Sequence, residues 1–186
     1  MNKEIKPIGF WSSLKPPKLT TFDWVLMALL IALNIVLERI VGVVGIESSY
    51  GISFVVIVFA AAHYGPLGAV IVSCLGDFLG SFFTGVPNPA FTLTAAVQGV
   101  IYGIALYENR GGYNWKKAFL AILPSQIICS LFMNSFFISF FYTGLDVFWQ
   151  KLLYVRLPQA LISTPLQLII TQLFMKTVYP RIKFKR

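Results

Sequence analysis

Charge is absent from four long stretches of this chain, and that absence constrains the fold more than any other feature. The stretches, at 48–76, 78–107, 118–145 and 157–175, carry no formally charged side chain. A helix that crosses a bilayer needs about 20 mainly apolar residues. Only 12% of the residues are charged, 57% are hydrophobic and the mean hydropathy is +0.76, whereas a soluble domain carries about 25% charged residues. The sequence therefore predicts an all-α integral membrane protein, and it disfavours soluble enzymes, nucleic-acid-binding modules and disordered chains.

Helix-breaking residues set the number of predicted spans. Two segments rich in glycine and proline interrupt the central region, at 63–66 (His-Tyr-Gly-Pro) and 86–89 (Val-Pro-Asn-Pro). Asp23, after two threonines, is a plausible first residue for the first helix. Six transmembrane helices result, at about 23–44, 50–63, 66–86, 90–108, 116–142 and 150–178.

The basic residues predict the orientation. With six spans and an internal N-terminus, twelve of the fifteen Lys and Arg residues fall on the inside, in the N-terminal tail, around 110–117 and after 175. Cytoplasmic loops carry such an excess of positive charge. We therefore expect a cytoplasmic N-terminal tail at 1–22, a six-helix membrane domain at 23–178 in the cell membrane, and a basic cytoplasmic tail at 179–186.

Small residues four positions apart indicate where helices approach closely. Gly76 and Gly80 on the third span, and Gly99 and Gly103 on the fourth, predict packing within the protein. Ala28 and Ala32 on the first span have the same spacing, but they could serve internal packing or a partner helix.

Polar residues inside the spans are the candidates for function, because burying them in a bilayer is unfavourable. Arg39 and Arg156 fall at the outer ends of the first and sixth spans. Glu38 is adjacent to Arg39, but neighbouring helix positions point about 100° apart, so we expect it to be a poor partner. The alternative role for the two arginines is snorkelling to the membrane interface or pairing with Glu38 and Glu47. Asp77 lies near mid-depth, where a structural hydrogen bond or ion pair is the favoured role over ligand contact.

Catalytic motifs are missing from the sequence. It has no phosphate-binding loop, nucleophile elbow or HExxH motif. His63 is the only histidine, and Cys74 and Cys129 stand alone in apolar runs, so we expect no metal, cofactor or disulfide. Binding is a better fit than enzymatic turnover.

Five segments resemble a known family: GISFVVI (51–57), AAAHYGPLG (60–68), GDFLGSFF (76–83), PAFTLTAA (89–96) and GVIYG (99–103). They are similar to the substrate-binding (S) components of energy-coupling factor (ECF) vitamin transporters, over about 22–178. RLPQALISTP (156–165), with FTLTAA from Phe91, looks most like the folate-specific branch. The resemblance implies a high-affinity folate binder that docks to a coupling protein and two ATPases, which hydrolyse the ATP. It also implies that Ala28 and Ala32 meet the coupling protein.

The expected ligand site lies on the extracellular side, between the outer ends of the third, fourth and sixth spans. Aromatic rings would supply flat walls for a pterin, neutral amides would meet its polar edge, and the two arginines would hold the two carboxylates of the glutamate tail. The predicted residues are Arg39, Phe82, Phe83, Asn88, Phe91, Gln98, Asn134, Arg156 and Gln159. Segments 86–89 and 47–51 are both candidates for a closing loop.

Alternatives remain at this point. Another vitamin of the same family, such as riboflavin, thiamine or a queuosine precursor, is possible. Thiamine is a cation, however, and the expected site contains two arginines. A membrane scaffold without a ligand would have little reason to place amides such as Gln98 and Asn134 in its outer half.

Overall fold

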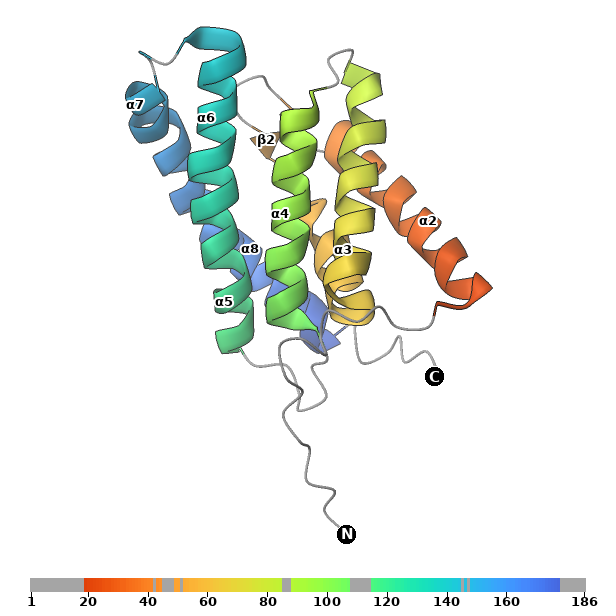
Figure 1. The fold of residues 1–186 in the computed structure, drawn as a ribbon. Coiled ribbons are helices and arrows are strands. Elements are labelled where there is room, and N and C mark those ends of the chain that lie inside the picture. Colours follow the sequence, from red (N-terminus) through yellow and green to blue (C-terminus); the bar gives the residue numbers. More distant parts are fainter. Residues whose placement is uncertain are drawn as a thin grey trace.

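The structure is a computed structural model that describes residues 19–41, 43–44, 49–50, 52–84, 88–107, 115–144, 146 and 148–177. The predicted tail 179–186, most of the predicted tail 1–22 and much of both candidate closing loops lie outside these residues. The described part is a bundle of helices, with one short pair of strands (Figure 1). The strands lie towards the end of the bundle where helix α3 (Phe54–Thr84) ends.

The first helix, α2 (Thr21–Val36), continues as a π-helical segment, η1 (Leu37–Val41). A capping box begins it: the Thr20 backbone N–H donates to Asp23 Oδ2 at 2.8 Å, and the Asp23 backbone N–H donates to Thr20 Oγ1 at 3.4 Å. Asp23 therefore acts in the helix start, as expected, but as the third helical residue.

The predicted first span extends too far at its outer end. Residues 43–44 form strand β1 (Val43–Val44), which pairs antiparallel with β2 (Ser49–Tyr50), so that Val43 faces Tyr50. Consecutive β-branched valines favour a strand once the helix has ended. The same pairing delays the second span, which begins at residue 54 instead of 50.

Helix α3 (Phe54–Thr84) contains the break predicted at 63–66. Gly65 has φ 75° and ψ −165°, and Pro66 follows it. Only glycine adopts this backbone without strain, and a Cβ at Gly65 would also lie 2.9 Å from the ring of Tyr107. The break turns α3 into two helical segments, which correspond to the predicted second and third spans.

The remaining helices match the predicted fourth, fifth and sixth spans closely. Helix α4 (Pro89–Leu106) begins after Asn88, whose side chain accepts a hydrogen bond from the Ala90 N–H at 3.0 Å. One rod comprises α5 (Trp115–Ser125), η2 (Gln126–Met133), α6 (Asn134–Ile138) and η3 (Ser139–Thr143). Another comprises α7 (Phe148–Lys151), η5 (Leu152–Arg156) and α8 (Leu157–Thr177).

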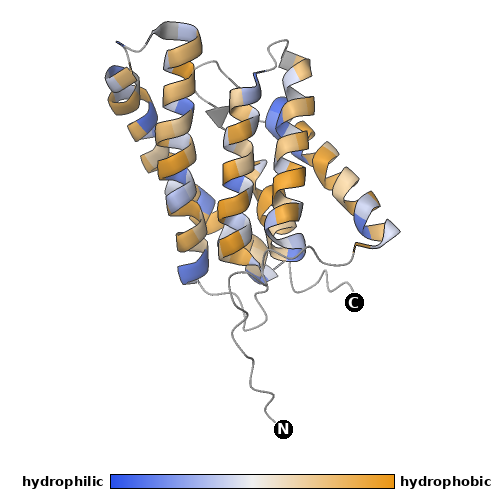
Figure 2. Ribbon diagram, viewed as in Figure 1, coloured by the Kyte–Doolittle hydropathy of each residue, from blue (hydrophilic) through white to orange (hydrophobic). Residues whose placement is uncertain are grey.

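Four helices in the described residues are long and apolar enough to cross a membrane: Thr21–Arg39, Phe54–Phe83, Pro89–Leu106 and Trp115–Tyr142. The rod at 148–177 is not among them, and α3 counts once despite its kink. Six crossings and the orientation of the termini therefore stay predictions. Hydrophobic residues predominate along the helices (Figure 2), and many large apolar side chains on the outside are exposed, including Leu29, Phe83 and Leu161.

The kinked α3 is the centre of the bundle and packs most closely on α4. Ala61, Ala69 and Tyr102 at their contact are fully buried. A Cβ on Gly99 would lie 2.9 Å from the backbone nitrogen of Val70, and one on Gly103 would collide with the backbone of Pro66. The predicted close approach at these two glycines is confirmed, and an adjacent face of α4 borders a cavity.

Candidate binding cavity

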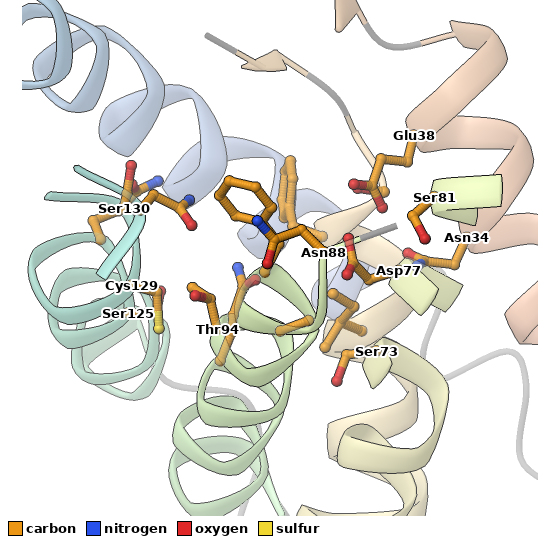
Figure 3. A pocket seen from close by; sticks show the side chains of 18 of the residues that line it. Asn34, Glu38, Ser73, Asp77, Ser81, Asn88, Thr94, Ser125, Cys129 and Ser130 are labelled. Carbon is orange, nitrogen blue, oxygen red and sulfur yellow. The ribbon is translucent and has the colours of Figure 1, made fainter. Parts of the chain in front are cut away.

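A cavity of about 490 Å³ lies inside the bundle, near the end where α3 finishes and α4 begins. Residues of α2, η1 and α3 form one side, α4 supplies the middle, and α5, η2 and α6 form the other side. Figure 3 shows Glu38 and Asp77 across the space from Ser125 and Cys129. A volume of this size is typical of small-molecule sites, so the cavity suits an organic ligand.

The first charged feature of the cavity is an arginine held between two carboxylates. Arg39 Nη2 lies 3.3 Å from Asp77 Oδ1 and 3.8 Å from Glu38 Oε1. Asp77 Oδ2 accepts a second hydrogen bond, from Thr92 Oγ1 at 2.9 Å. Asp77 therefore links the C-terminal end of the first helix to α3 and α4. The ion-pair role predicted for Asp77 is confirmed. Glu38 also reaches ion-pair distance, but Asp77 is the nearer carboxylate and the one that accepts a hydrogen bond from Arg39.

Two glycines of α3 make room for these polar side chains. A Cβ on Gly76 would collide with the amide of Asn34, and a Cβ on Gly80 would lie 3.0 Å from Arg39 Nε. Because the glycines are four residues apart, they form two adjacent notches on one face of α3. The small residues predicted for close packing here accommodate polar side chains of the first helix.

The second arginine of the cavity comes from the last rod. Arg156 is 6% exposed, and its Nη1 donates to Gln159 Oε1 at 3.3 Å. Arg39 and Arg156 thus contribute to one cavity from opposite ends of the chain. Two guanidinium groups in a single small space favour an anionic ligand, because each guanidinium matches a carboxylate with two parallel hydrogen bonds.

Neutral polar groups and flat apolar groups complete the walls. Gln98 Nε2 donates to Tyr102 OH at 3.4 Å, which fixes one amide beside the cavity. Asn34 Oδ1 and Gln167 Oε1 are buried without a hydrogen-bond partner, and both residues line the cavity. Phe54 and Phe91 supply aromatic surface. Such a mixture of donors, acceptors and rings suits a flat heterocycle with a polar edge.

Metal binding has no comparable support. Within the described ranges, no group of three or more His, Cys, Asp or Glu side chains is arranged to hold a metal ion.

The comparison with known families decides what kind of protein this is. A family described as "ECF transporter, substrate-specific component" matches residues 22–174. The chain belongs to this family. Such a protein is the substrate-binding component of a transporter, and the apolar helices make it a multi-pass membrane protein.

Two individual relatives show which branch of the family this chain resembles. The folate transporter FolT of Clostridium novyi (strain NT) is 33% identical over 147 residues, which cover 77% of this chain and 82% of the relative. The folate transporter FolT of Leuconostoc mesenteroides subsp. mesenteroides is 31% identical over 134 residues, which cover 68% of each chain. Among these S components, the chain is most like the folate-specific branch.

A solved structure shares the fold. It is described as the crystal structure of FolT bound with folic acid, and it matches with a TM-score of 0.80 at 24% identity. The match covers 89% of this chain and 98% of the other. The bundle described above is therefore the fold of an S component.

The cavity of this S component brings together most of the predicted site residues. Six of the nine predicted residues line the cavity: Arg39, Asn88, Phe91, Gln98, Asn134 and Arg156. Gln159 is not among the lining residues and instead bonds Arg156. Phe82 and Phe83 lie outside this lining, with 59% and 77% of their surfaces exposed. The cavity-facing positions of α3 after its kink are Ser73, Asp77 and Ser81.

Sequence reasoning missed several lining residues, among them Asn34, Phe54 and Ile57. Asn34 precedes Glu38 by four residues, a spacing that places both on one helix face, and this signal was available in the sequence. Phe54 and Ile57 gave no such signal, because they resemble any other apolar residues of a span.

The alanine pair of the S component lies on the outside. Ala28 and Ala32 of α2 are exposed, and so are the neighbouring Val25, Leu29 and Leu33. In the described residues, these alanines are thus not buried in contacts with other helices of this chain.

Proposed function

We propose that this S component binds folate in the cavity between α2, α3, α4 and the last two rods, and that it serves folate uptake. The observation that carries the proposal is the presence of Arg39 and Arg156 in a single cavity. Folate ends in a glutamate with two carboxylates, and each has a matching guanidinium. The names of the two relatives and the folic acid bound to the structural neighbour support the same ligand.

The remaining predicted residues have roles in this proposal. Phe91 and Phe54 contact the faces of the pterin ring. Asn88, Gln98 and Asn134 offer donors and acceptors to its amide and amino edge. Gln159 holds Arg156 in place, and Phe82 and Phe83 have no part in the pocket because they are exposed.

The topology that fits this role has six spans. The kink at Gly65 separates the second span from the third, and the rod at 148–177 is the sixth. Both tails, 1–22 and 179–186, are then cytoplasmic, and the cavity opens to the extracellular side of the cell membrane. The excess of basic residues in the tails and around 110–117 supports this orientation.

Energy comes from other subunits in this proposal. The S component delivers folate by docking to a transmembrane coupling protein, and two ATPases hydrolyse ATP. The exposed Ala28 and Ala32 let a helix of the coupling protein approach α2 closely.

Purification in detergent tests the ligand directly. We expect a pterin to co-purify, identified by its absorbance and mass, and titration of the ligand-free protein with folate to saturate at one molecule per chain. Riboflavin, thiamine and a queuosine precursor serve as competitors. Tight binding of one of these without folate binding would contradict the proposal, and binding of none would favour a scaffold.

A further inference from the structure

Asp77 occupies the place beside Arg39 that the proposed function gives to a ligand carboxylate. Its Oδ1 lies 3.3 Å from Arg39 Nη2, while its Oδ2 is fixed by the Thr92 hydroxyl at 2.9 Å. Glu38 lies farther away, at 3.8 Å, on the same nitrogen. A ligand carboxylate that approaches Nη2 therefore meets a position already held by a carboxylate of the protein.

An arginine in this position needs a counter-ion when no ligand is bound. Its side chain is 14% exposed and sits between membrane-crossing helices. An unpaired charge in such surroundings is strongly unfavourable, and intramembrane charges pair with one another. Asp77 meets this need from inside the protein.

Among the described residues of the cavity, the positive and negative charges balance before a ligand enters. Its described lining contains two arginines, Arg39 and Arg156, and two acidic residues, Glu38 and Asp77. A ligand with two carboxylates adds negative charge next to both acidic side chains. Like charges in close contact repel, so part of the attraction to Arg39 is offset by Asp77.

We propose that Asp77 is the counter-ion of Arg39 in the empty cavity, and that a ligand carboxylate replaces it on binding. Asp77 is then a specificity-determining residue, because it sets how much an anionic ligand gains at Arg39. Thr92 retains one hydrogen bond to Asp77 after Arg39 has turned to the ligand. This inference rests on the proposed folate binding and adds a residue that the ligand need not touch.

Asp77→Asn is the decisive variant. Asparagine has the same size, accepts a hydrogen bond from Arg39 and bonds Thr92, but it carries no charge. The probes are folate and its diamide, in which both tail carboxylates are carboxamides. Titration of the purified protein should show folate binding about three- to thirtyfold tighter than in the wild type, with diamide binding unchanged. The melting temperature of the ligand-free variant should fall.

Thr92→Val is the matched control. It removes the hydrogen bond to Asp77 and leaves every charge in place, so the preference for folate over the diamide should stay that of the wild type. Weaker folate binding by Asp77→Asn, or an equal change for both ligands, would overturn the inference while leaving the proposed function intact. Failure of the wild-type protein to bind folate would overturn both.

A measurement on the wild type decides the matter if Asp77→Asn does not fold. Once Arg39 binds folate, Asp77 and Glu38 are left without their cation, and proton uptake restores the balance. Calorimetric titration in two buffers of different ionisation enthalpy should show proton uptake with folate and none with the diamide. Equal proton exchange for both ligands would reject the replacement of Asp77. The titratable or charged side chains in the described lining are Glu38, Arg39, Asp77, Cys129, Tyr142 and Arg156.

Discussion

Gly80 of α3 lies directly against the guanidinium of Arg39, and a Cβ on Gly80 would stand 3.0 Å from Arg39 Nε. The neighbour is the far end of a flexible side chain, so Gly80→Ala should move Arg39 without breaking the bundle. We expect folate binding to weaken about three- to tenfold while the melting temperature changes little. Titration with folate and with its diamide checks the prediction, because only folate should be affected.

Gly99→Ala is the control for that prediction. A Cβ there would lie 2.7 Å from Oγ of Ser73, an uncharged lining residue, and 2.9 Å from the backbone nitrogen of Val70, and backbone cannot move aside as a side chain can. We expect a loss of about 1–3 kcal/mol of stability. Any change in affinity should be the same for folate and for the diamide. A selective loss of folate binding in Gly99→Ala would mean that Gly80 has no special relation to Arg39.

Gln98 and Gln159 should differ in which ligands they affect. Gln98 lines the cavity beside Tyr102, so Gln98→Ala should weaken folate and diamide alike, by a few-fold to about a hundredfold. Gln159 bonds Arg156 Nη1 at 3.3 Å, so Gln159→Ala should weaken folate more than the diamide. Titrations of both variants with both ligands check this, and unchanged affinity in both would remove these glutamines from the site.

The helices were predictable because their causes are local. Uncharged stretches, the break at Gly65 and Pro66, and the helix start around Asp23 each act within a few residues, and each is present in the structure. The strand pair at Val43–Val44 and Ser49–Tyr50 was missed. Its stability depends on pairing between two segments, which the hydropathy of either one does not reveal.

The cavity was only partly predictable. Arg39 and Arg156 stand out in a sequence because charge is rare in membrane spans, and the structure places both in one cavity. The faces of the helices were harder to assign. Phe82 and Phe83 look like good aromatic walls, but the rotation of α3 turns Asp77 and Ser81 inward and leaves both rings exposed.

Ala28 and Ala32 should affect uptake without affecting binding. Both are exposed on α2, so replacing both with tryptophan blocks the close approach of a partner helix and leaves the cavity intact. We expect cellular folate uptake to be lost and the affinity of the purified protein for folate to be retained. Ile162→Trp with Leu166→Trp, at two exposed positions four residues apart on α8, is the control. Loss of uptake and binding together would indicate that the alanines support the fold of this chain.

A charged and an uncharged ligand should together show whether the two arginines bind carboxylates of the ligand. A charge-assisted hydrogen bond is worth about 1.5–3 kcal/mol, so Arg39→Ala and Arg156→Ala should each weaken folate binding about ten- to a hundredfold. The diamide lacks the carboxylates and should lose much less. Arg39→Ala should also lower the melting temperature of the ligand-free protein, because it leaves Asp77 and Glu38 without their shared cation. Arg156 Nη1 donates to the neutral side chain of Gln159. Equal losses for folate and the diamide in both variants would show that the arginines support the structure and do not hold the glutamate tail.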